Sequence, residues 1–296
     1  FVYDNQFTVA PYIGDSNYKI VNGDMGDSEF LDVVSKNISD VIILSGLVGD
    51  PITKKYKEEA FEINNRSIKN IINSCVDSNV SRLLFISTCS NYGLIGNEEF
   101  ATEDTILNPL SDYAKEKINI EKFILSLKNK VKFYPTILRF ATAFGLSPRM
   151  RFDLTVNQFT REIFFNKKIL IYDPETWRPY CHVKDFANLI QLVIKSEKDK
   201  VDFEIFNAGD QKNNFNKIGI VNMIKKYLPN FELEFKENGG DARNYKVDFT
   251  KVKNILGFEA EYSVEKGIKE IMETLDQGKF KSTKDYQDNL GNYIIK

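Results

Sequence analysis

Residues 82–93 read RLLFISTCSNYG, an apolar run that ends in a loop rich in hydroxyl groups. Its length and its β-branched and aromatic residues are typical of a buried strand. Similar runs lie at 1–4 (FVYD), 18–22 (YKIVN), 41–46 (VIILSG) and 134–140 (YPTILRF), and segments of helical period such as 56–76 separate them. Because parallel strands need long crossover connections, this alternation predicts an α/β fold with a doubly wound parallel sheet and helices on both faces.

The second half of the chain is less regular. We expect helices near 153–165 and 184–195, one more sheet strand in FEIFNAG at 203–209, and alternating strands and helices from about 214 to 277. This order predicts a larger domain made of 1–145 with about 184–210. A smaller α/β domain follows from about 146–183 and 211–280, and 281–296 is a polar tail.

Composition excludes several classes of protein. The 296 residues are 42% hydrophobic and 28% charged, with a net charge of -2, so neither nucleic acid nor an anionic membrane is an expected partner. No apolar run approaches the roughly 20 residues of a membrane helix, and we expect a cytoplasmic protein. The three cysteines are widely spaced around one histidine, His182, so neither a disulfide framework nor a metal site is expected.

The beginning of the chain has an unusual form. Phe1 is not a methionine and stands inside an expected strand, so we expect that upstream residues are missing. Asp4 ends that strand, where a dinucleotide-binding fold places a carboxylate to accept hydrogen bonds from the adenosine ribose. Asp4-Asn5 could equally begin a turn.

Tyr113 and Lys117 form a YxxxK pair, whose spacing puts both side chains on one face of a helix. A tyrosine with a pKa of about 10 acts as a base near neutrality only if nearby positive charge favours the phenolate, and an ammonium one turn away supplies such charge. Tyr180/Lys184 and Tyr262/Lys266 share the spacing. Only Tyr113 follows a strand that ends in a hydroxyl-rich loop.

That loop is STCSNYG, at 87–93. The Thr88 hydroxyl could hydrogen-bond the substrate oxygen that Tyr113 protonates or deprotonates. A turn closed by a Ser or Thr side chain is the structural alternative, and the tyrosine downstream favours the catalytic interpretation.

The chain resembles the extended short-chain dehydrogenase/reductase family, which includes NAD-dependent nucleotide-sugar epimerases, dehydratases and dehydrogenases. The motifs that carry the resemblance occur in order over about nine tenths of the chain. Within the family, FGLSPRMRFDLTVNQFT at 144–160 is most similar to enzymes acting at C4 of the sugar, including GDP-heptose 4-dehydrogenase-like and sugar-nucleotide 4-epimerase members. The motifs are YDN, GDMGD, LSGLVGD, Asn64, STCSNYG, YAKEK, LRFATAFG, RPYCHVKD and GDARNYKVD.

The resemblance implies a Rossmann-like dinucleotide-binding domain that lacks its first strand and glycine loop, a smaller substrate-binding domain, and a homodimer. It implies NAD as cofactor and a GDP-, UDP- or dTDP-linked sugar as substrate. The implied catalytic set is Thr88, Tyr113 and Lys117. The implied cofactor contacts are Asp4, Asn5, Asp24, Met25, Leu44, Ser45, Gly46, Asn64, Tyr113 and Lys117.

One departure from the family pattern bears on the reaction. Dehydratases of the family carry an Asp-Glu pair after the catalytic threonine, and this chain has Cys89 and Ser90 there. Elimination of water is therefore disfavoured. No histidine lies near Cys89 in sequence to activate it as a nucleophile, so a small buried filler is its expected role.

The substrate contacts are expected in the second half. Guanidinium groups suit a diphosphate, and Arg178 and Arg243 lie in blocks that match the family, whereas Arg149 and Arg151 could equally be solvated. His182 is expected to be structural. The full set of expected substrate contacts is Thr88, Ser90, Asn157, Arg178 and Arg243.

Three functions compete. The first is an NAD-dependent enzyme that oxidises a nucleotide-sugar hydroxyl, with C4 as the expected position, and either releases the ketone or returns hydride as an epimerase, with Tyr113 as acid/base. The second is a catalytically inactive dinucleotide-binding regulatory protein, against which the intact Thr88, Tyr113 and Lys117 argue. The third is a 4-keto-sugar reductase using NADPH, disfavoured because the Asp4 charge would repel a 2′-phosphate.

Overall fold

The computed structural model describes residues 21, 23–35, 37–76, 78–96, 99–147, 150–237, 239 and 242–280. The strand expected at 1–4, most of the strand expected at 18–22 and the polar tail 281–296 lie outside these residues.

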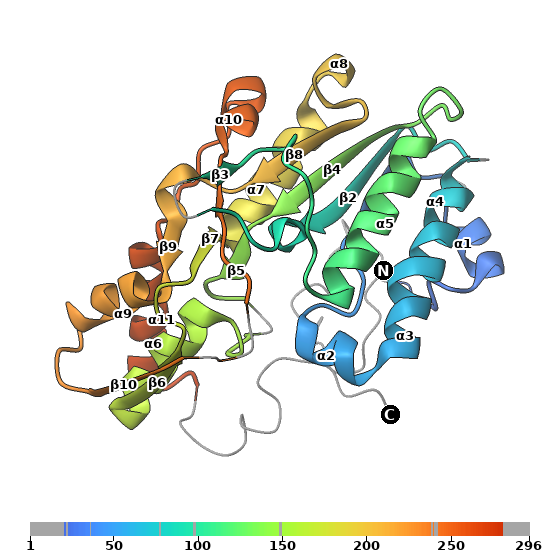
Figure 1. Ribbon diagram of the computed structural model, residues 1–296. Coiled ribbons are helices and arrows are strands. Elements are labelled where there is room, and N and C mark those ends of the chain that lie inside the picture. Colours follow the sequence, from blue (N-terminus) through green and yellow to red (C-terminus); the bar gives the residue numbers. More distant parts are fainter. Residues whose placement is uncertain are drawn as a thin grey trace.

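The centre of the molecule is a parallel sheet of four strands (Figure 1). Its order is β1 (Asp40–Ile43), β2 (Arg82–Thr88), β4 (Tyr134–Phe140) and β8 (Glu204–Ala208). Each neighbouring pair is parallel. The expected parallel α/β sheet is therefore confirmed, including FEIFNAG as one of its strands.

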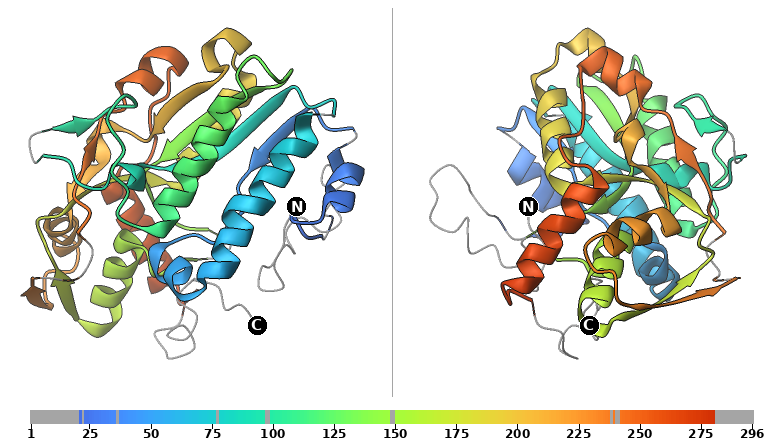
Figure 2. Two further views of the ribbon diagram at one scale, coloured as in Figure 1. Left: turned by 45° about the vertical axis from the view of Figure 1, so that its right-hand side comes forward. Right: turned by 90° about the vertical axis from the view of Figure 1, so that its left-hand side faces the viewer.

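Both faces of this sheet are covered (Figures 1 and 2). On β2, Leu83 and Phe85 belong to a cluster with residues of α4 (Ile68–Val76) and α5 (Asp112–Ser126). Leu84 belongs to a second cluster, with residues of α7 (Val183–Lys195). Because successive strand residues face opposite sides, an uninterrupted apolar run is what a sheet buried on both faces requires.

The helix expected over 56–76 is confirmed, with one irregularity. It runs as α3 (Lys57–Phe61), a π-helical segment η2 (Glu62–Ser67) and α4. The segment buries Asn64, Asn65 and Ser67. Two shorter helices precede it, α1 (Ser28–Ser35) and α2 (Asp50–Lys55).

The second half forms a smaller α/β layer beside the sheet, at the lower left of Figure 1. Its core lies among three helices, α6 (Thr155–Asn166), α9 (Lys217–Lys225) and α11 (Val264–Asp276). Three strands pair in the order β5 (Thr142–Phe144), β7 (Trp177–His182) and β9 (Asn214–Asn216), and β6 (Lys168–Tyr172) pairs with β10 (Glu232–Lys236). The remaining short elements are η3 (Cys89–Tyr92), β3 (Phe100–Ala101), α8 (Lys198–Val201), η4 (Gln211–Asn213), β11 (Lys246–Val247) and α10 (Thr250–Leu256).

A late segment of the chain returns to the parallel sheet. Tyr245, Val247, Phe249 and Val252 are buried in the same cluster as Leu138 of β4. Strand β11 also pairs in parallel with β3, which lies in the first half of the chain. The segment that carries Arg243 is thereby held against the end of the sheet.

Gly145 follows β5 and packs against His182. Its φ is 97°, and a Cβ there would lie 1.9 Å from Nε2 of His182. His182 is fully buried, accepts a hydrogen bond at Nδ1 from the backbone N–H of Lys184 at 3.1 Å, and has Nε2 2.9 Å from Oε2 of Glu270. The structural role expected for His182 is confirmed, because it caps α7 and packs against this glycine.

We expect Gly145→Ala to lower the free energy of unfolding by about 3 kcal/mol, because the methyl group clashes with a fixed ring and φ is left-handed. The control is Gly257→Ala, at φ 69° with nothing within 4 Å of the added Cβ. That variant should lose only about 1 kcal/mol, from the backbone alone. Denaturant unfolding measures both, and equal losses would contradict the proposed clash.

Candidate active site

Thr88 ends β2 and begins the turn that follows. Its Oγ1 accepts a hydrogen bond from the backbone N–H of Ser90 at 3.1 Å, which caps the 3₁₀ turn η3. The structural alternative for this loop is therefore present. It does not exclude the catalytic one, because a hydroxyl that accepts one bond still has its hydrogen to donate.

Helix α5 carries Tyr113 and Lys117 on its buried face. The helix begins at Ser111, whose Oγ accepts from the N–H of Ala114 at 3.3 Å. Lys117 Nζ donates to the carbonyl oxygen of Ile86 in β2 at 2.8 Å and lies 5.9 Å from the centre of the Tyr113 ring. The ammonium thus lies beside the tyrosine and is bonded to the strand that ends at Thr88.

The charge of Lys117 is held in an unusual environment. Burial lowers the pKa of Lys117 to about 8, and the carboxylates of Glu121 and Glu116 oppose that shift. An ammonium has three N–H donors, and the described residues supply one acceptor for it, at Ile86. Lys117 can therefore still donate to a bound hydroxyl.

The loop after β1 contains the expected cofactor residues Leu44, Ser45 and Gly46. Leu44 is 64% exposed, and Gly46 has φ 144°. Gly46 also lies so close to Asn64 that a Cβ would stand 2.8 Å from Oδ1 of that side chain. An exposed loop with a glycine at the carboxyl end of a parallel strand suits a close approach of a phosphate to the backbone.

The side chain of Asn64 holds this loop in place through hydrogen bonds to the backbone of Leu47. Its Oδ1 accepts from the N–H of Leu47 at 2.8 Å, and its Nδ2 donates to the carbonyl oxygen of Leu47 at 3.0 Å. Nδ2 also donates to Oε2 of Glu116 on α5 at 2.7 Å. The observed role of Asn64 is to connect the loop to the helix that carries Tyr113, and a direct contact with cofactor stays a prediction.

The remaining expected cofactor residues lie nearer the start of the chain. Asp24 accepts the N–H of Gly26 in the turn before α1, at 2.7 Å, and Met25 packs against the cluster under α4. Asp4 and Asn5 lie outside the described residues. Their expected contacts with the cofactor stay predictions.

Three expected substrate residues from distant segments meet near η3. Arg243 Nη1 donates to Oγ of Ser90 at 3.3 Å, and Arg178 Nη1 donates to the backbone carbonyl of Arg243. Tyr245 joins them, with its hydroxyl 3.3 Å from Oγ of Ser90 and its ring 5.1 Å from the Arg178 guanidinium. Arg178 is 6% exposed, whereas Arg243 is half-buried, so the two arginines have different access to a ligand.

The other polar residues named from the sequence form contacts with neighbouring segments of the chain. Asn157 accepts the N–H of Gly145 at 3.0 Å and donates to the carbonyl of Arg151 at 2.9 Å. Arg151 forms an ion pair with Asp153. A contact of Asn157 with substrate phosphate stays a prediction, and Arg149 lies outside the described residues.

Cys89 is a buried filler, as expected. It is 1% exposed, and its Sγ donates to the carbonyl oxygen of Arg139 at 3.0 Å. Burial raises the pKa of this thiol far above its ordinary value. Cys89 therefore has neither the ionisation nor the access of a nucleophile.

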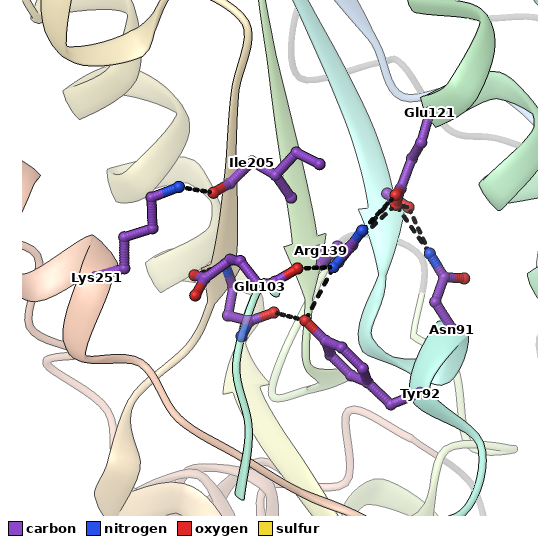
Figure 3. A network of polar contacts seen from close by, with 9 residues as sticks. Asn91, Tyr92, Glu103, Glu121, Arg139, Ile205 and Lys251 are labelled. Carbon is purple, nitrogen blue, oxygen red and sulfur yellow. Dashed lines mark hydrogen bonds and ion pairs between the residues drawn. The ribbon is translucent and has the colours of Figure 1, made fainter. Parts of the chain in front are cut away.

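Sequence reasoning missed a buried polar network behind this site (Figure 3). Arg139 of β4 forms an ion pair with Glu121 of α5, with Nη2 2.7 Å from Oε2. Two signals were available. A single arginine interrupts the apolar run YPTILRF, and Glu121 stands four residues after Lys117 on the same face of a helix.

The matching family profile covers residues 3–209, and it describes an NAD dependent epimerase/dehydratase family. The chain belongs to this family. The resemblance to NAD-dependent nucleotide-sugar enzymes is thereby confirmed, and the expected NAD cofactor is confirmed as that of the family.

Individual relatives agree with this placement. The chain is 25% identical over 267 residues to the low-salt glycan biosynthesis protein Agl12 of Haloferax volcanii, covering 88% of this chain and 83% of that protein. It is 25% identical over 259 residues to a UDP-glucuronate 4-epimerase of Thermodesulfobacterium geofontis, covering 86% and 78%.

Solved structures share the fold. A UDP-glucuronic acid 4-epimerase from Bacillus cereus, in complex with UDP-glucuronic acid and NAD, has a TM-score of 0.81 at 19% identity and covers 91% of this chain and 85% of its own. The UDP-glucose 4-epimerase of Thermotoga maritima, with UDP-glucose, has a TM-score of 0.78 at 22% identity, covering 87% and 84%.

Among the described residues, no group of three or more His, Cys, Asp or Glu side chains could hold a metal ion. The helices in the described part of the chain are too short or too polar to cross a membrane.

We expect the thiols of the native protein to react slowly with an exposed-thiol reagent at pH 7.5, because Cys75, Cys89 and Cys181 are all buried. After denaturation the same assay should count three thiols. Rapid reaction of one thiol in the native protein, mapped to Cys89 by peptide mass, would contradict the filler role.

Proposed function

We propose that this chain oxidises a hydroxyl group, the one at C4, of a nucleotide-activated sugar with NAD, and that Tyr113 is the acid/base. The observation that carries the proposal is the position of Lys117. Its ammonium donates to the β2 carbonyl of Ile86, two residues before Thr88, and lies 5.9 Å from the centre of the Tyr113 ring. A buried positive charge at that place favours the phenolate form of the tyrosine, which a base requires.

The residues of the chain divide the work as follows. The phenolate oxygen of Tyr113 takes the proton of the sugar hydroxyl, and the Thr88 hydroxyl donates a hydrogen bond to the same oxygen. The loop Ser45–Gly46, fixed by Asn64, and the free donors of Lys117 would hold the cofactor. NAD supplies the acceptor for the hydride that leaves the sugar carbon. Release of the ketone makes the enzyme a dehydrogenase, and return of the hydride to the opposite face makes it an epimerase.

Elimination of water does not fit the residues after Thr88. Cys89 is buried and bonded to a backbone carbonyl, and Ser90 is bonded to Tyr245 and Arg243. Neither side chain supplies the carboxyl group that would protonate a departing hydroxyl. The geometry therefore favours oxidation without dehydration.

The cluster of Ser90, Arg178 and Arg243 supports a substrate with a diphosphate. The phosphates are strongly hydrated, so a protein competes with water only through charge-assisted donors in matched positions. Arg243 is the half-buried member, and Arg178 bonds its carbonyl oxygen. We propose that Arg243 contacts the diphosphate and that Arg178 mainly holds Arg243 in place.

We expect Tyr113→Phe to lower turnover with a UDP-, GDP- or dTDP-hexose by roughly a hundredfold or more, the scale of lost general acid/base catalysis. NAD binding should change little, because the ring and Lys117 remain. Steady-state kinetics and calorimetric titration with NAD measure the two effects.

Product masses give the control for the same experiment. The wild-type product should have the mass of the substrate, for an epimer, or a mass lower by two hydrogens, for a ketone. A product lighter by one water would contradict the proposed reaction, and undiminished turnover of Tyr113→Phe would contradict the assigned base. A wild-type chain that binds NAD but turns over none of these sugars would favour the regulatory alternative.

We expect Arg243→Ala to raise KM for the nucleotide sugar much more than it lowers kcat, because a phosphate contact is made equally in the ground and transition states. The loss should be about 1.5 to 3 kcal/mol, typical of a hydrogen bond to a charged group. Arg178→Ala should raise KM in the same sense, and Arg178→Lys should recover part of it. Substrate titrations of the three variants measure this, and a kcat defect at constant KM would contradict the phosphate role.

A further inference from the structure

Helix α5 presents a third buried polar residue on the face that carries Tyr113 and Lys117. Glu121 stands one turn beyond Lys117 and is 2% exposed. Its carboxylate accepts hydrogen bonds from three side chains. These are the Arg139 guanidinium, with Nη2 at 2.7 Å and Nε at 3.2 Å, and the Asn91 amide at 2.8 Å (Figure 3), together with the Ser87 hydroxyl.

Two of these donors flank Thr88. Ser87 is the residue before it in β2, and Asn91 lies in the 3₁₀ turn that Thr88 caps. Both donate to the same oxygen, Oε1 of Glu121, and Asn91 Nδ2 also donates to Oγ of Ser87 at 3.2 Å. The Thr88 turn is therefore attached on both sides to one atom of the helix that bears Tyr113.

The contacts of this ion pair extend beyond Glu121 and Arg139 themselves. Arg139 spreads its other contacts over the Tyr92 hydroxyl at 3.1 Å and the carbonyl of Glu103 at 3.2 Å. A buried ion pair is weak evidence for stability, because two apolar side chains of similar volume often serve the fold as well. An apolar pair would remove the acceptor of the Ser87 hydroxyl, one of the two acceptors of Asn91 and one of the two carboxylates near Lys117.

Among the described residues, the groups that face Lys117 come from its own helix and from β2. On its own helix they are Tyr113, Glu116 and Glu121, and from β2 they are the ring of Phe85 and the carbonyl of Ile86. Burial lowers the pKa of Lys117, and of its two acidic neighbours Glu121 opposes this more than Glu116 does. Glu116 is itself buried, which raises the pKa of its carboxyl group. Glu121 is therefore the main counter-charge of the ammonium.

We propose that Glu121 is a positioning residue for the reaction: its carboxylate sets the Thr88 turn against Tyr113 and keeps the Lys117 ammonium charged. The inference rests on the proposed function, because it assumes that Thr88, Tyr113 and Lys117 carry the chemistry. It adds a residue that does not touch substrate or cofactor and acts through all three.

Two single variants separate the charge from the hydrogen bonds. Glu121→Gln keeps an oxygen that can accept from Ser87 and Asn91 but removes the negative charge. Ser87→Ala removes one hydrogen bond to Oε1 and leaves the charge in place. Glu204→Gln is the matched control, because it removes a carboxylate from β8, away from α5. The Glu204 carboxylate pairs with Lys251 at 2.6 Å.

The measurement is kcat/KM against pH with NAD and the nucleotide sugar. With less negative charge nearby, Lys117 loses its proton at lower pH, so Glu121→Gln should move the alkaline limb down by about one pH unit. Ser87→Ala should lower kcat about tenfold at its pH optimum, because the Thr88 turn is displaced, with the alkaline limb unmoved. Glu204→Gln should change neither quantity.

A second variant protects the test from misfolding. Glu121→Gln leaves Arg139 buried without its partner, which can unfold a protein. The double variant Glu121→Leu/Arg139→Met removes both charges, and it should unfold at a temperature close to that of the wild type while showing both the lowered kcat and the shifted alkaline limb. The ionisation of Lys117 can be followed independently by NMR of isotope-labelled lysine, with Lys117→Met to assign the signal.

The outcomes are distinct. A folded double variant with an unmoved alkaline limb and an unmoved lysine titration would overturn the role of Glu121 even if Tyr113→Phe is inactive. Full turnover of Tyr113→Phe would instead overturn the proposed function, on which this inference rests. A shifted lysine titration in Glu204→Gln would also count against Glu121, because the effect would then not be local.

Discussion

The buried ion pair between Glu121 and Arg139 is the constraint around which the polar contacts at the centre of the molecule are arranged. A charge removed from water is costly unless every one of its hydrogen-bonding positions is satisfied, so this pair dictates what surrounds it. Tyr92, which donates to Oδ1 of Asn207 at 2.6 Å, extends the arrangement to β8. Asn207 in turn donates to the carbonyl of Asp248 at 3.1 Å, beside α10. Segments from both halves of the chain therefore meet around one pair of charges.

The nearly neutral net charge of the chain conceals strong local separation. Lys117 and Glu121 lie among apolar residues on the buried face of α5. Arg178 and Arg243 lie where β7 and the segment before β11 meet. In a protein interior of low dielectric constant, such charges interact more strongly than they would in water and are little screened by salt. The location of each charged side chain, rather than the net charge of the chain, therefore decides what the candidate site can bind.

Much of the fold was predictable because apolar periodicity reports burial directly. The uninterrupted run RLLFI indicates a strand covered on both faces, and Leu83 and Leu84 do lie in clusters on opposite sides of β2. Tyr113 and Lys117 were predictable because i,i+4 spacing fixes their common face.

The partners of Asn64 and Glu121 were not predictable. Their contacts join residues 17 to 52 positions apart in Asn64 and 18 to 34 positions apart in Glu121, which no local pattern encodes. The meeting of Ser90, Arg178 and Arg243 likewise depends on how β11 returns to the sheet. Each residue was recognisable alone, but their geometry required the tertiary structure.

The π-helical segment Glu62–Ser67 changes the directions in which side chains before and after it point from the long helix of the first half. A π turn holds one residue more than the α-helical turn it replaces, so residues before and after it are rotated relative to one another by about 100°. This offset lets Asn64 point to the loop at Leu47 while Ile68 and Ile72 still face the sheet. One added residue therefore lets this helix contact the loop at Leu47 and the sheet with two different faces.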